Sequence, residues 1–104
     1  MKNTLMELEG IIRSKAGSNI ETSYTAGLLS KGTDKCCEKF GEEAIEFIIA
    51  STKNDFANLK EETADVLYHM LVVLVAHNIN LEDVLDILQQ RMATSGLLEK
   101  ANRK

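Results

Sequence analysis

The segment VLYHMLVVLVA, residues 66–76, restricts the possible fold more than any other part of the chain. On a helix its side chains are apolar nearly all the way round, and a helix without a polar face must be covered on every side. The chain contains no proline, the residue that most strongly interrupts helices. Its long stretches rich in leucine, alanine and glutamate favour helix. We therefore predict an all-α fold.

Apolar periodicity and capping signals predict where the helices lie. We expect helices at about residues 3–15, 23–32, 33–51, 56–77 and 81–92. The first should bury one face, formed by Leu5, Leu8, Ile11 and Ile12. Ser23 and Asn80 are suited to cap the helices that follow them, as is Thr33 or Asp34 for the third, and Gly32 is suited to end the second.

A chain of 104 residues with about four or five helices has little material to surround segment 66–76. We expect a helical bundle built on a central antiparallel hairpin, forming one domain over residues 1–104. We also expect a homodimer with this segment in or near the interface. The alternative is that the segment forms the central helix of a monomeric bundle.

Charge and composition exclude several classes of protein. The net charge of −4 argues against nucleic-acid binding. The longest apolar run, residues 70–76, is too short to span a membrane, and the first residues lack a signal-peptide pattern. Cys36 and Cys37 are the only cysteines, too few for a disulfide framework or a zinc site. We expect both to be packing residues, and we expect a cytoplasmic protein.

Charged residues form one stripe along the predicted helix 33–51. At about 100° per residue, the stripe occupies an arc of about 100° and consists of Lys35, Lys39, Glu42, Glu43 and Glu46. Another face carries the apolar residues Cys36, Phe40, Ala44, Phe47 and Ile48. Toward its end, at residues 47–50, this helix should be buried all round.

Two pairs of acids, each with a spacing of three, lie on consecutive predicted helices. If Asn54 is the pivot of an antiparallel hairpin, Glu46 and Glu62 lie eight residues from it on either side, and Glu43 and Asp65 lie eleven residues away. At ~1.5 Å per residue, the acids sit at matching heights, about 12 to 17 Å from the turn. We predict that the four carboxylates converge.

Four converging carboxylates repel one another unless a cation neutralises them. Oxygen-only ligands favour hard cations, so Mg²⁺ is expected and Mn²⁺ also fits, with either one or two ions. A di-iron bundle would need Glu-x-x-His, which the sequence does not contain. A solvated acidic helix face remains the alternative. His69, one turn after Asp65, is suited to orient that residue, to touch substrate or to be a half-buried polar residue.

The acid pairs form an ExxE pattern (Glu43 and Glu46) followed by an ExxD pattern (Glu62 and Asp65). This combination resembles the all-α nucleoside triphosphate pyrophosphohydrolases, the MazG-like superfamily. SYTAGLLSKGTDKCCEKFGEEAIEFIIA, EETADVLYHMLVVLVAHNINLEDVLDIL and TSGLLEKANRK together resemble the phosphoribosyl-ATP pyrophosphatases, which act in histidine biosynthesis, and cover essentially the whole chain. The resemblance implies Mg²⁺-dependent hydrolysis of phosphoribosyl-ATP to phosphoribosyl-AMP and pyrophosphate by a helical dimer. Some members of the family are fused to a cyclohydrolase domain; we expect this chain to be of the stand-alone form.

The resemblance also assigns roles to residues. It implies metal ligation by Glu43, Glu46, Glu62 and Asp65, with Glu42 as an outer group or water-orienting base. It implies substrate contacts by Ser23, Tyr24, Thr25, Lys31, Lys35 and Lys39, to which His69 is added by its position. For the two lysines of the stripe, ordinary pairing with Glu38, Glu42 or Glu43 is the alternative.

Two other functions fit the sequence. A house-cleaning pyrophosphohydrolase would use the same metal site on a non-canonical nucleotide, and segments 23–32 and 94–103 would decide the substrate. A non-enzymatic helical interaction module would use the apolar segment 66–76 as a partner surface.

Overall fold

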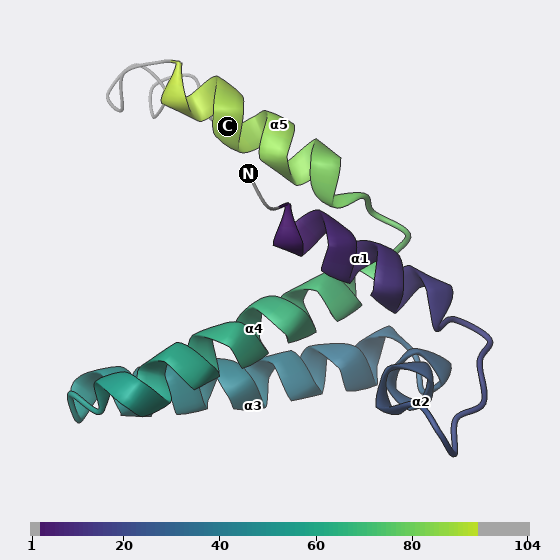
Figure 1. Cartoon of the computed structure of the whole chain (residues 1–104), viewed down its shortest axis with the longest axis horizontal. Helices are drawn as coiled ribbons and strands as arrows, with labels where there is room; N and C mark the ends of the chain where they lie inside the picture. The colour runs from purple at the N-terminus through teal and green to yellow at the C-terminus, as the bar shows by residue number, and fades with distance from the viewer. Residues whose placement is uncertain (1–2, 94–104) are drawn as a thin grey trace.

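The computed structural model describes residues 3–93, which form a bundle of five helices (Figure 1). The helices are α1 (Thr4–Ser14), α2 (Tyr24–Ser30), α3 (Thr33–Thr52), α4 (Phe56–Ala76) and α5 (Leu81–Met92). No strand occurs among these residues, so the all-α prediction is confirmed. None of the described helices is long and apolar enough to cross a membrane. The predicted substrate segment 94–103 lies outside the described residues.

Helices α3 and α4 form the antiparallel hairpin expected from the sequence and lie side by side along most of their length (Figure 1). The turn between them passes through Asn54, which has a positive φ of 55°. Asp55 then caps α4, because its carboxylate accepts a hydrogen bond from the Asn58 backbone N–H at 3.3 Å. The predicted pivot of the hairpin is thereby confirmed.

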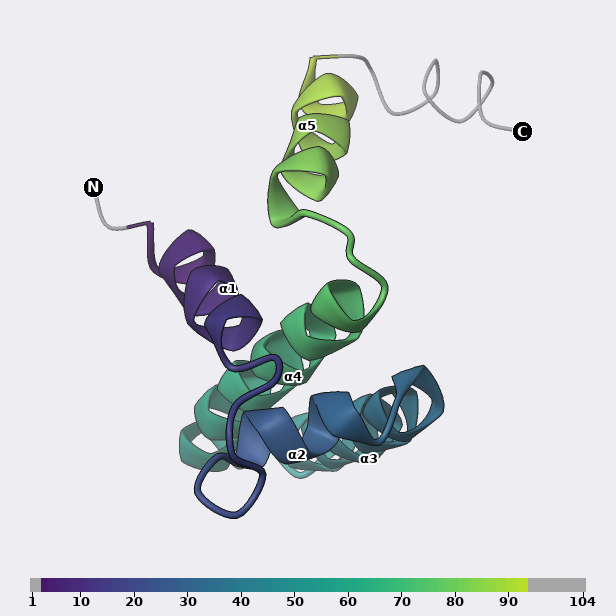
Figure 2. The ribbon, with the colours of Figure 1, turned by 90° about the vertical axis from the view of Figure 1, so that its right-hand side faces the viewer.

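The core lies where α1, α2 and the first turn of α5 pack against the hairpin. Ile12 of α1 and Val72 of α4 are almost completely inaccessible to solvent. The buried cluster consists of Ile12, Leu28, Cys36, Leu71, Val72, Val75 and Leu81. After its first turn, α5 projects away from the hairpin (Figure 2). The α4 residues of the buried cluster all belong to the apolar segment 66–76.

Helix α5 is capped by a residue distant in the sequence. Oε2 of the buried Glu9 accepts a hydrogen bond from the Leu81 backbone N–H at 2.6 Å. Arg13 donates to the same oxygen at 3.2 Å and also to the side-chain oxygens of Asn78 and Asn80. Asn80 occupies the predicted capping position, but its side chain makes no capping hydrogen bond. The cap is supplied by α1 instead.

The prediction that Thr33 or Asp34 caps α3 is wrong, because Gly32 occupies this position with a φ of 92°. The Gly32 N–H donates to the Leu29 carbonyl at the end of α2, and its own carbonyl accepts from the Cys36 N–H. One glycine therefore ends one helix and begins the next. So short a connection leaves no room for a separate cap residue, and Thr33 is already helical.

Some predicted burial is also corrected. Cys36 is fully buried and its thiol donates to the Leu28 carbonyl at 3.4 Å, but Cys37 is exposed and is no packing residue of this chain. Ile11 and Ile48 are each 56% exposed, so neither belongs to the buried face predicted for its helix. Exposed Ile49 shows that the end of α3 is not buried all round. The reason is that, among the described helices, only α4 runs beside this end of α3.

Candidate metal centre and its surroundings

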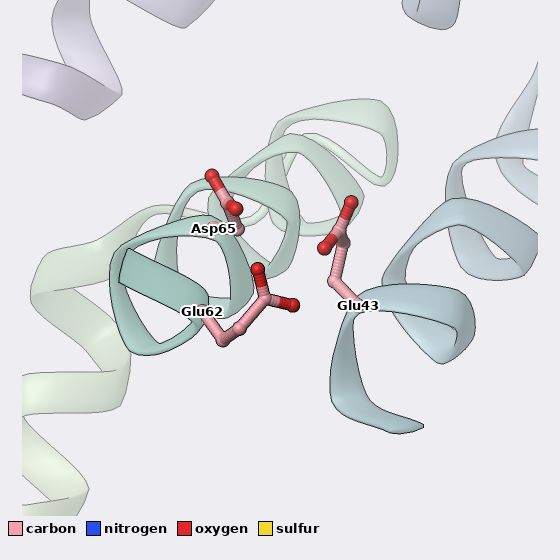
Figure 3. A group of neighbouring side chains, drawn as sticks. All are labelled: Glu43, Glu62 and Asp65. Carbon is pink, nitrogen blue, oxygen red and sulfur yellow. The ribbon is translucent and has the colours of Figure 1, made fainter. Parts of the chain in front are cut away.

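Three of the four predicted acids form one group between the helices of the hairpin. Glu43 reaches from α3 toward α4, and Glu62 and Asp65 extend from α4 on the side facing it (Figure 3). One oxygen from each carboxylate lies within 4.8 Å of one oxygen from both others. The spacing of three within α4 and the antiparallel register of the hairpin produce this convergence.

Glu46, the fourth predicted acid, lies on the flank of this group. Its carboxyl group interacts with those of Glu43 and Glu62, but it is not among the three that share one point. A hollow of about 330 Å³ follows on the side toward the turn, lined by Glu46, Ile49, Asn58 and Glu62. Asn58 was not predicted as a site residue. Its position four residues before Glu62, and thus on the same helix face, is the signal that points to it.

The acids raise one another's pKa values. Hydrogen bonding to the Glu46 carboxyl group, together with burial and the charges of Glu46, Glu43 and Asp65, raises the pKa of Glu62 to about 7. Burial, and then the hydrogen bond and charge of Glu46, raise the pKa of Glu43. A shared proton or a bound cation relieves this repulsion.

The residues fit a hard divalent cation. Oε2 of Glu43 and Oε2 of Glu62 are buried and have no hydrogen-bond partner among the described residues. Burial removes the hydration of such oxygens without compensation, and a bound cation would provide that compensation. All the donors are carboxylate oxygens, which suits Mg²⁺ or Mn²⁺ better than zinc. Glu43, Glu62 and Asp65 would hold the ion, and Glu46 is close enough to assist them.

The two lysines of the charged stripe both pair with acids on α3. Lys35 lies 3.5 Å from Glu38, and Lys39 lies 3.3 Å from Glu42, which is exposed. The hydrogen bond to Glu42, followed by the charge of Glu42, raises the pKa of Lys39. Both lysines thus make the local pairs that the sequence offered as the alternative. Their contact with phosphate remains a prediction.

The predicted substrate-binding residues in and next to α2 have different positions: some lie at the ends of the helix, and others contact α4. The Ser23 hydroxyl accepts a hydrogen bond from the Ala26 N–H at 3.1 Å and caps α2, as expected. Lys31 is exposed at the other end of the helix. The Tyr24 hydroxyl lies 3.4 Å from Nε2 of His69 on α4. Helix α2 therefore meets α4 one turn beyond the carboxylate group.

His69 is buried and fixed by two partners. Its Nδ1–H donates to the Asp65 backbone carbonyl at 2.9 Å, and in the neutral ring Nε2 then accepts from the Tyr24 hydroxyl. The contact with Asp65 is therefore to its carbonyl group and not to its carboxylate. One alternative from the sequence was that His69 is a half-buried polar residue, whereas the structure buries it.

Tyr68 was not predicted as a residue of the site. Its hydroxyl group forms a hydrogen bond with that of Thr25, and its ring lies edge-on to His69 with centroids 4.9 Å apart and stacks on Tyr24 at 6.5 Å. Burial raises the pKa of Tyr68. A phenol within an otherwise apolar segment needs a polar partner, and this need was the available signal.

Comparison with known proteins agrees with the motifs. Residues 5–92 match the family model described as phosphoribosyl-ATP pyrophosphohydrolase. A phosphoribosyl-ATP pyrophosphatase of Ruegeria sp. (strain TM1040) is 57% identical over 95% of this chain and 94% of its own length. That of Rhodobacter capsulatus is 52% identical over 95% and 96%, and phosphoribosyl-ATP pyrophosphatase 1 of Rhodopseudomonas palustris is 50% identical over 97% and 94%. The predicted resemblance is confirmed, and the chain belongs to the phosphoribosyl-ATP pyrophosphohydrolase family.

Proposed function

We propose that this chain hydrolyses the α–β phosphoanhydride of phosphoribosyl-ATP, using Mg²⁺ held by Glu43, Glu46, Glu62 and Asp65. The products are phosphoribosyl-AMP and pyrophosphate, in the second step of histidine biosynthesis. The observation that carries the proposal is the group of three carboxylates with two buried, unpartnered oxygens, in a member of this family. The relatives' names favour this substrate over a non-canonical nucleotide, and the hydrolase family favours an enzyme over an interaction module.

The chain's own residues bind and orient the substrate. Bound Mg²⁺ would supply charge neutralisation of the phosphates and a lower pKa for a coordinated water. Lys35 and Lys39 exchange their glutamate partners for phosphate oxygens and stabilise the leaving pyrophosphate. Glu42, released from Lys39, accepts a proton from the attacking water at its carboxylate.

On the other side of the acids, α2 forms a wall of the substrate site. The residues proposed to line it are Ser23, Tyr24, Thr25, Lys31 and His69. The Ser23 hydroxyl is occupied by the helix cap, so its contribution is to fix the first turn of α2. Tyr24 is 59% exposed and Lys31 is exposed, so both are free to meet the substrate.

We also infer a homodimer. A hollow of about 300 Å³, lined only by Cys37, Phe40, Met70, Val73 and Leu74, opens on the hairpin. Exposed apolar side chains continue on α3 and α5, including Ile45, Ile48, Ile87, Leu88 and Met92. A second copy is the occupant that fits, because the sequence already required the apolar segment 66–76 to be covered. A sedimentation experiment that finds only monomer at micromolar concentration would contradict this inference. The cytoplasmic location stays a prediction.

The test is pyrophosphate release from phosphoribosyl-ATP, ATP and dUTP, with and without Mg²⁺. We expect release chiefly from phosphoribosyl-ATP and only with the ion. Glu46→Ala and Asp65→Ala should retain their helical circular dichroism and lose activity on the order of 100-fold or more. Glu61→Ala removes an exposed acid beside the group and should stay within about twofold of the unmodified chain. Full activity in both site variants refutes the assignment.

A further inference from the structure

Tyr68 has no role in the proposed reaction, yet its hydroxyl group forms a hydrogen bond with another helix. It lies within the apolar part of α4, and its hydrogen-bond partner is the Thr25 hydroxyl on α2. Neither hydroxyl has another hydrogen-bond partner among the described residues. Tyr68 also follows Asp65 by one helical turn, so this contact joins α2 to α4 directly beside the carboxylate group.

Helix α2 has few other means of attachment. It contains seven residues, too few to be stable as an isolated helix, and only Ala26 and Leu28 are buried. Its second half is held by Leu28, whose side chain belongs to the core and whose carbonyl accepts from the Cys36 thiol. The first turn is held on α4 by polar contacts, from Tyr24 to His69 and from Thr25 to Tyr68.

We propose that the Tyr68 and Thr25 hydroxyls form a latch that positions the first turn of α2, and with it Tyr24, at the edge of the metal site. Tyr68 and Thr25 are thus positioning residues that act through Tyr24. The part of Thr25 in the wall of the substrate site is to fix this turn, because its hydroxyl is engaged with Tyr68, as the Ser23 hydroxyl is engaged in the helix cap. The Tyr24 hydroxyl lies 3.4 Å from Nε2 of His69, and Nδ1 of the same ring donates to the Asp65 carbonyl, so the residue held by the latch borders the carboxylate group. This inference rests on the proposed function.

The substitutions Tyr68→Phe and Thr25→Val remove one hydroxyl each and keep the shape of the side chain. The phenylalanine ring retains the contacts with Tyr24 and His69. We expect each variant to raise KM for phosphoribosyl-ATP about five- to tenfold with kcat within about twofold, since one hydrogen bond is lost. The double variant should be no worse than either single variant, because the two hydroxyls act only through each other.

Two further measurements separate a latch from a general loss of stability. The Mg²⁺-induced rise in melting temperature should equal that of the unmodified chain, because α3 and α4 hold the acids without α2. Amide hydrogen exchange at Ala26 and Gly27, whose N–H groups donate to the Ser23 hydroxyl and carbonyl at the start of α2, should accelerate about tenfold while exchange at Ala50 is unchanged. Ser30→Ala is the matched control, because its hydroxyl donates only to the Gly27 carbonyl within α2.

The outcomes are distinct. Unchanged KM, additive effects of the two substitutions, or unchanged exchange in α2 would each overturn the latch. A kcat that falls together with the Mg²⁺ response would assign the pair to the stability of the metal site and overturn it as well. If the unmodified chain releases no pyrophosphate from phosphoribosyl-ATP, the proposed function fails, and hydrogen exchange alone then decides whether the latch exists.

Discussion

Replacing Glu9 with alanine tests how α5 is attached. The substitution removes the carboxylate that accepts the Leu81 N–H at 2.6 Å in a buried setting, and a hydrogen bond to a charged group contributes about 1.5–3 kcal/mol. The pair with Arg13 adds little, at most about 1 kcal/mol, because the arginine side chain is 36% exposed. We therefore expect the free energy of unfolding to fall by about 2–3 kcal/mol.

Glu9→Gln separates the acceptor from the charge. The amide oxygen can still accept the Leu81 N–H, so this variant should lose only about 1 kcal/mol. Glu7→Ala, on the same helix but exposed and without a side-chain partner in the described region, should stay within about 0.5 kcal/mol of the unmodified chain.

Urea unfolding followed by circular dichroism at 222 nm measures all three variants, at one protein concentration because a dimer makes stability concentration-dependent. For Glu9→Ala the midpoint should fall by about 1 to 2 M. Hydrogen exchange at the Leu81 amide should accelerate in the same variant. A midpoint unchanged by Glu9→Ala, or equal losses for alanine and glutamine, would refute the idea that this carboxylate caps α5.

Three further predictions concern the acids, the core and the helix junction. Because the pKa of Glu62 is raised to about 7 in the fold, its contribution to metal-free stability is complete below about pH 4.5 and is lost as the pH rises through 7. In thermal scans, the melting temperature should thus fall more steeply from pH 5 to 8 in the unmodified chain than in Glu62→Gln. The rise in melting temperature caused by Mg²⁺ should grow over the same pH range, and a pH-independent Mg²⁺ effect would contradict this. Ile12→Ala should cost about 2–4 kcal/mol in urea unfolding, against less than about 1 kcal/mol for its neighbour Ile11→Ala, which is 56% exposed; equal costs would contradict the burial described. Gly32→Ala should destabilise the chain by about 1–3 kcal/mol, because Gly32 has a φ of 92°. Gly41→Ala, within α3, should be neutral or stabilise the chain by up to about 1 kcal/mol. Melting temperatures that move in the opposite sense would exclude this account.

The hairpin and the approach of its acids were predictable because both follow from local rules. Helical periodicity fixes which face carries Glu62 and Asp65, and counting outward from Asn54 fixes their height against Glu43. Counting does not include side-chain rotamers. Glu46 therefore lies beside the group of three although its height along the hairpin was correctly matched.

Contacts between distant segments were not predictable in the same way. Glu9 looks like an ordinary charged residue of an amphipathic helix, and nothing near it in the sequence indicates an N-terminus for it to cap. The Tyr68–Thr25 contact likewise depends on how α2 docks on α4. The exposed end of α3 was missed for a different reason: apolar residues indicate that a surface becomes covered but not which chain covers it.

The position of both acid pairs within the single stretch 43–65 also has a consequence for biosynthesis of the protein. The contacts that assemble the ligands join residues close in sequence, so little chain entropy is lost in closing the loop between them. The contact between Glu9 and Leu81 spans 72 positions and requires nearly all of the described chain. During translation, the ion-binding hairpin should therefore form while α5 is still within the ribosome, and attachment of α5 to α1 should be a late event.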